Sequence, residues 1–168
     1  MTNATDTFEG LRSLLSEAGV SVRFGSERPA PASLTDPAYH VCVFAVAVSI
    51  LGRRENVHQV IDERLLRFGQ FIATRPVLLA DVQNAAKRWP RGAMPSGYAT
   101  EPTILATLQY LAASGGVTRR EGLLWAPITG PLMALASQIR VAEMFATEVN
   151  VLETLADLSI TKKSLGEW

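Results

Sequence analysis

The sequence predicts a mainly α-helical domain with a small β-hairpin, and three observations support this prediction. Apolar residues recur at helical spacing through most of the chain after residue 35. Several of these segments open with a capping residue followed by proline and close at glycine, which is the usual punctuation of helices. One short tract is instead typical of a hairpin, because Val117-Thr118-Arg119 and Leu123–Pro127 are separated by Arg120-Glu121-Gly122.

Composition fits one domain of ordinary size or two very small ones. The chain has 168 residues, of which 48% are apolar and 19% charged, so it can bury a core and keep some apolar surface for a partner. Its 16 basic and 16 acidic side chains give a net charge of zero, which argues against a nucleic-acid binder, since such proteins usually carry excess positive charge. Residues 51–91 nevertheless carry eight basic and four acidic residues, whereas residues 141–168 carry five acidic and two basic ones. This asymmetry is compatible with self-association, partner docking or weak DNA contact. It is also compatible with two charged surfaces that only face solvent.

The first 35 residues are expected to form an N-terminal extension. Apolar spacing predicts a short helix from Phe8 to Ala18, Val20–Phe24 is compatible with a short strand, and Arg28–Ser33 contains two prolines and is expected to be a linker. No signal peptide is predicted, and the longest apolar run, Tyr39–Leu51, is too short for a membrane span. We therefore expect a cytoplasmic protein with no membrane contact.

Three helices are predicted in the first half of the domain at residues 36–168. The first begins at Pro37 behind Thr35 or Asp36, ends at Gly52, and is apolar on nearly all sides, so it is expected at the centre of the fold. The second is predicted over Val57–Thr74, and the third begins at Pro76 and ends near Trp89. Residues 90–98 form a proline- and glycine-rich loop, at which a division into two subdomains is an open alternative.

The second half is expected to run helix, hairpin, helix. A helix from Pro102 ends at Gly115-Gly116, the hairpin joins Val117–Arg119 to Leu123–Pro127, and a long helix starts at Pro131. The pattern leaves open whether that last helix breaks near Arg140. A helix, a tight hairpin and a long helix make up the back half of a winged-helix module, so the predicted fold class is winged-helix-like.

No constellation of residues in the sequence predicts catalysis, a cofactor or a metal. Phosphate-binding, dinucleotide-binding and nucleophile-elbow motifs are missing from the sequence. His40 and His58 lie 18 positions apart, and Cys42 falls inside the most apolar run, so buried or boundary side chains are expected. The acids Asp62 and Glu63, beside Arg64 and Arg67, are expected to form surface ion pairs at helical spacing.

The candidate functional residues are therefore surface cations that would contact DNA or a partner protein. Arg119 and Arg120 lie at the hairpin, where a wing arginine often reaches a phosphate, although exposed turns also collect arginines without such a role. Lys87, Arg88 and Arg91 lie at the end of the third helix, where the helix dipole by itself favours cations.

Across residues 35–168 the chain resembles the small middle component of bacterial three-component ABC-ATPase systems, the accessory subunit of Lamassu-type anti-phage defence. The resemblance is carried by Asp36-Pro37-Ala38, Leu65-Leu66-Arg67-Phe68 with Thr74-Arg75-Pro76, Gly97-Tyr98 before Pro102, and the closing Leu165-Gly166-Glu167-Trp168. It implies a non-catalytic winged-helix subunit, similar to the kite subunits of SMC complexes, that bridges an SMC-like ABC ATPase and an effector nuclease. ATP and metal would then belong to the partners. A winged-helix DNA-binding regulator is the alternative.

Overall fold

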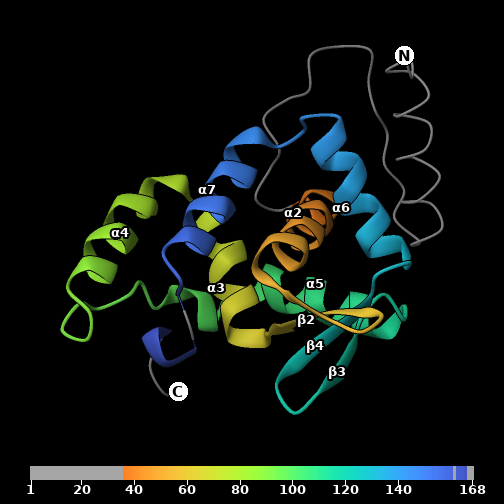
Figure 1. The fold of residues 1–168 in the computed structure, drawn as a ribbon, viewed down its shortest axis with the longest axis horizontal. Helices are drawn as coiled ribbons and strands as arrows, with labels where there is room; N and C mark the ends of the chain where they lie inside the picture. The colour runs from red at the N-terminus through yellow and green to blue at the C-terminus, as the bar shows by residue number, and fades with distance from the viewer. Residues whose placement is uncertain (1–35, 161, 166–168) are drawn as a thin grey trace.

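The computed structural model describes residues 36–160 and 162–165, and this part of the protein is mainly helical with one small antiparallel sheet (Figure 1). This confirms the predicted fold class, a mainly α, winged-helix-like domain. The helices are α2 (Pro37–Leu51), α3 (Glu63–Ala73), α4 (Leu79–Lys87), α5 (Pro102–Ala113), α6 (Pro131–Val141) and α7 (Ala146–Asp157). Short 3₁₀ turns are η1 (Pro76–Leu78), η2 (Gly97–Ala99) and η3 (Lys162–Leu165). The helix, strand and linker expected before residue 36, and the closing Trp168, lie outside the described residues.

Helix α2 is the centre of the fold, as its all-round apolar character predicts. Its first turn is capped by the Asp36 carboxylate, which accepts a hydrogen bond from the amide of Ala38 at 2.9 Å, and Pro37 occupies the first helical position. The helix is buried from Tyr39 to Val48, and it packs against α3, α5, α6 and α7. Elements from both sides of the 90–98 loop therefore contribute to one hydrophobic core.

The sheet is larger than the sequence predicts. It contains β1 (Arg53–Glu55), β2 (His58–Asp62), β3 (Thr118–Arg120) and β4 (Leu123–Pro127), in the antiparallel order β1-β2-β4-β3. The prediction of one helix over Val57–Thr74 is wrong at its start, because residues 58–62 pair with β4 and only then does the chain become helical. Asn56, with φ of 51°, sits in the left-handed region and reverses the chain between β1 and β2.

The predicted hairpin is confirmed as β3 and β4. Its two-residue turn is Glu121-Gly122, and both residues have positive φ, 51° and 74°. That combination matches the right-handed twist of the two strands. One face of the sheet, with Ile61, Leu124 and Ala126, joins the hydrophobic core beneath the helices.

The long C-terminal helix is broken, which resolves the open alternative at Arg140. Helix α6 ends at Val141 and α7 begins at Ala146, and between them Glu143 and Phe145 have φ of 53° and 54°. Non-glycine residues in the left-handed region interrupt a right-handed helix. Within the described ranges, no helix has both the length and the apolar character that crossing a membrane requires.

Candidate functional site

The hairpin arginines point to opposite faces of the sheet. Arg119 is the cross-strand neighbour of Leu124, which in turn pairs with Ile61, so Arg119 shares the face of the sheet that meets the core. Arg120 is one residue further along and pairs with Leu123, so its side chain takes the other face. Adjacent arginines that look equivalent in the sequence therefore have different surroundings.

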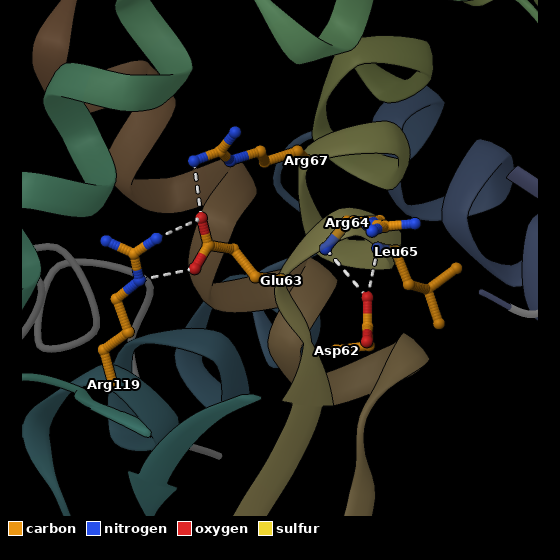
Figure 2. Close-up of polar contacts among 6 residues, drawn as sticks. All are labelled: Asp62, Glu63, Arg64, Leu65, Arg67 and Arg119. Atoms are coloured by element: carbon orange, nitrogen blue, oxygen red, sulfur yellow. Dashed lines mark hydrogen bonds and ion pairs between the residues drawn. The ribbon is translucent and has the colours of Figure 1, made fainter. Parts of the chain in front are cut away.

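Arg119 is engaged by a buried carboxylate at the start of α3 (Figure 2). The Glu63 side chain is only 9% exposed, and its Oε2 accepts from Arg119 Nε at 2.6 Å while its Oε1 accepts from Arg119 Nη2 at 3.1 Å. The same Oε1 accepts from Nη2 of Arg67, one helical turn along α3. We call Glu63, Arg67 and Arg119 the hairpin clamp.

The clamp fixes the hairpin to the helical body. It is reinforced by the backbone, where the amide of Glu63 donates to the carbonyl of Gly122 in the hairpin turn at 2.9 Å. Figure 2 also shows Asp62 capping α3, its Oδ1 accepting from the amides of Arg64 at 2.9 Å and Leu65 at 3.4 Å. The expected ion pair at helical spacing is present between Glu63 and Arg67, but the Glu63 carboxylate is buried rather than on the surface, and Asp62 also caps α3.

The second group of predicted contact residues lies at the end of α4. Lys87, Arg88 and Arg91 are exposed, and Trp89 between them leaves 46% of its surface in solvent. In Figure 1, α4 lies toward the left end of the molecule and the β3–β4 hairpin lies at the lower right. The five candidate cations therefore form two separate groups rather than one basic face.

The central histidine and the cysteine both sit in the core. His40 is 2% exposed, and its ring Nδ1 lies 3.3 Å from Gln70 Nε2, which also donates to the His40 carbonyl at 3.1 Å. Cys42 is 4% exposed, and burial, with a smaller contribution from the Asp36 charge, raises the pKa of its thiol to about 12. A thiol held in its neutral form is a poor nucleophile, and the prediction of a buried structural cysteine is confirmed.

Two polar contacts tie distant parts of the chain around the core. The Tyr39 hydroxyl donates to Glu148 at 2.7 Å, and burial together with this carboxylate raises the Tyr39 pKa above its ordinary value. Arg75 Nη2 donates to Glu101 at 2.7 Å while its guanidinium lies 4.3 Å from the centre of the Phe71 ring. Both contacts join residues far apart in the sequence, and they hold the helices together.

The sequence alone did not indicate the roles of Glu63 and Trp89. Glu63 attaches the hairpin, and Trp89 is an exposed ring between cations. Glu63 could not be paired with Arg119 because they are 56 positions apart and their contact depends on β2 pairing with β4. Trp89 follows the helical spacing of the third predicted helix, which favours an inward side chain, but it is 46% exposed; the sequence signal for this exposure is its position between cations and beside proline at a helix end. Among the described residues, no group of three or more His, Cys, Asp or Glu side chains is arranged to hold a metal ion.

No known protein family, curated protein or solved structure matches this sequence.

Proposed function

We propose that this protein is a non-catalytic accessory subunit that bridges an SMC-like ABC ATPase and an effector nuclease in a cytoplasmic bacterial anti-phage defence complex. The observation that supports the proposal is the arrangement of exposed cations at two separated ends of a single core. Arg120 lies at the hairpin, and Lys87, Arg88 and Arg91 lie at α4. A bridging subunit needs two such surfaces on one rigid body, so that both partners can be held at once.

The hairpin clamp supports a rigid role for the wing. Arg119 directs two of its N–H groups at Glu63, and the hairpin turn is also held by the backbone of α3. A hairpin fixed in this way presents a defined shape to a protein partner without paying an ordering cost on binding. The winged-helix-like fold itself agrees with the kite-type subunit that the sequence resembles.

A winged-helix DNA-binding regulator is the second candidate, and the exposed Arg120 at the hairpin favours it. This reading expects one basic face made by the hairpin arginines and the cations of residues 53–91. The separation of α4 from the hairpin and the engagement of Arg119 by Glu63 both weaken it. DNA contact by Arg120 alone would be weak and strongly salt-dependent, because few phosphates would be neutralised.

The test of the proposal is affinity purification of the tagged, full-length chain from cells that express the native neighbouring genes, followed by mass spectrometry. We expect a coiled-coil ATPase and a nuclease to be recovered in fixed ratio with the chain. Recovery of the chain alone, or with DNA only, would contradict the proposal and favour the regulator.

A further inference from the structure

The end of α4 presents an ordered surface of three cations around one exposed aromatic ring. We call Lys87, Arg88, Trp89 and Arg91 the α4-end surface. Its backbone is held by a succession of hydrogen bonds: Trp89 N to Ala86 O at 3.2 Å, Arg91 N to Arg88 O at 2.8 Å, and Gly92 N to Arg88 O at 3.1 Å. These side chains therefore project from a fixed turn.

The positive charge of this surface is not compensated within the described part of the chain. Five other arginines each pair with a carboxylate, namely Arg53, Arg67, Arg75, Arg119 and Arg140. No acidic residue occurs between Val82 and Thr100, and Lys87, Arg88 and Arg91 make no ion pair with any described residue. With respect to the residues that the structure describes, these three charges are therefore available to an acidic partner.

A purely structural role accounts for only part of this surface. Cations in the last turn of a helix are stabilised by the helix dipole, which explains Lys87 and Arg88. The dipole gives no reason for Arg91, which lies beyond the helix, or for a half-exposed indole ring. Tryptophan and arginine together are the residues most enriched where protein interfaces gain their affinity.

We infer that the α4-end surface binds an acidic, amphipathic segment of a protein partner, with carboxylates facing the three cations and an apolar side chain packed on Trp89. The inference deepens the proposed function and rests on it, since it names the chemistry of one of the two bridged partners. A nucleic acid fits less well, because three cations neutralise few phosphates and give weak binding at physiological salt.

The experiment places a photo-reactive benzoylphenylalanine at position 89 of the full-length chain in cells that express the native neighbouring genes. We expect the cross-linked peptide, sequenced by mass spectrometry, to carry several carboxylates flanking an apolar residue. A synthetic peptide of that sequence is then titrated into the purified chain. Removing the ring with Trp89→Ala, or two charges with Arg88→Gln/Arg91→Gln, is expected to weaken binding by about tenfold or more.

The matched control is Arg53→Gln/Arg54→Gln, which removes two exposed charges from β1 and is expected to leave peptide binding unchanged. Equal thermal melting of all variants establishes that each is folded. A cross-link to DNA, a cross-link to a neutral or basic segment, no cross-link, or equal weakening by the control overturns the inference.

The same variants separate this inference from the proposed function. If the ATPase and nuclease co-purify equally well with Arg88→Gln/Arg91→Gln, the surface inference fails and the bridging function stands. If the acidic segment belongs to a protein that is neither an ATPase nor a nuclease, the surface inference stands and the proposed function fails.

Discussion

Glu63 is the residue on which the attachment of the hairpin depends most directly. It is buried, and it accepts from two arginines that come from different parts of the chain. Replacing it by glutamine removes the negative charge and leaves Arg67, whose Nε already lacks a hydrogen-bond partner within the described residues, without its ion pair. We expect Glu63→Gln to lower the free energy of unfolding by about 2–4 kcal/mol, measured by urea denaturation.

Two arginine variants serve as comparisons for the effect of Glu63→Gln on the free energy of unfolding. The Arg119 side chain is 58% exposed, so Arg119→Ala is expected to cost only about 0.5–1 kcal/mol because solvent screens the pair. Arg120→Ala, on the other face of the hairpin, should change the free energy of unfolding little. If Glu63→Gln costs no more than Arg120→Ala, the clamp does not hold the hairpin.

The raised pKa of Cys42 predicts how the free energy of unfolding changes at alkaline pH. The pKa of its thiol rises from 9.0 to about 12 on folding, so the folded chain binds this proton more tightly than the unfolded chain does. The resulting stabilisation is fully present below pH 9 and is lost progressively as pH rises toward 12. The raised pKa of Tyr39 acts in the same direction above pH 10.

Chemical denaturation of wild type and Cys42→Ala across this pH range measures the effect. The variant removes a buried sulfur and is less stable at pH 7, but its stability should fall less steeply above pH 9 because one titrating group is gone. Parallel curves for the two proteins would show that the thiol ionises equally in both states.

At the scale of elements, helix ends were predictable where side chain and backbone act locally. The Asp36-Pro37 start and Gly52 end of α2 can be read from the sequence, because capping, proline geometry and chain termination involve neighbouring residues. The β3–β4 turn was likewise predictable from Glu121-Gly122. Strand β2 was not, since Val60 and Ile61 also fit a helical stripe and the partner that makes them a strand is some 65 residues later.

The candidate site was predictable only in part, and for the same reason. The cations at the hairpin and at the end of α4 were identified from residue type and position alone. Which hairpin arginine is engaged depends on strand register, and the burial of Glu63 depends on the β2–β4 pairing. Both are set by contacts between distant segments, which no local pattern encodes.

Gly92 fixes the turn that carries the α4-end surface. A Cβ atom built at this position would lie 2.2 Å from the carbonyl oxygen of Ala85, which is backbone of α4 and cannot yield without moving the helix end. We expect Gly92→Ala to lower the free energy of unfolding by about 1–3 kcal/mol and to weaken binding at the α4-end surface. Denaturation and the peptide titration measure the two effects.

Gly116→Ala is the matched control for this substitution. A Cβ atom there meets the Leu111 carbonyl oxygen at 3.4 Å, which is an ordinary contact, and the residue has no positive φ. It is expected to be tolerated. Equal effects of the two variants would mean that the close approach at Gly92 does not control the end of α4.

At the scale of the whole molecule, one core built around α2 carries projecting elements at separate ends. The clamp attaches the hairpin, and the buried Val82 of α4 joins the hydrophobic core. Because both elements are anchored to the same core, a partner bound at one end is held at a defined distance from a partner bound at the other. This geometry underlies the proposed bridging function.

Reconstitution tests that central claim most directly. The two proposed partners, an SMC-like ABC ATPase and an effector nuclease, are purified separately and mixed, with and without the chain, and the masses of the assemblies are measured by analytical ultracentrifugation. We expect one assembly containing all three proteins, and no association of ATPase with nuclease when the chain is left out. Association of the two without the chain, or failure of the chain to bind both at once, would contradict it.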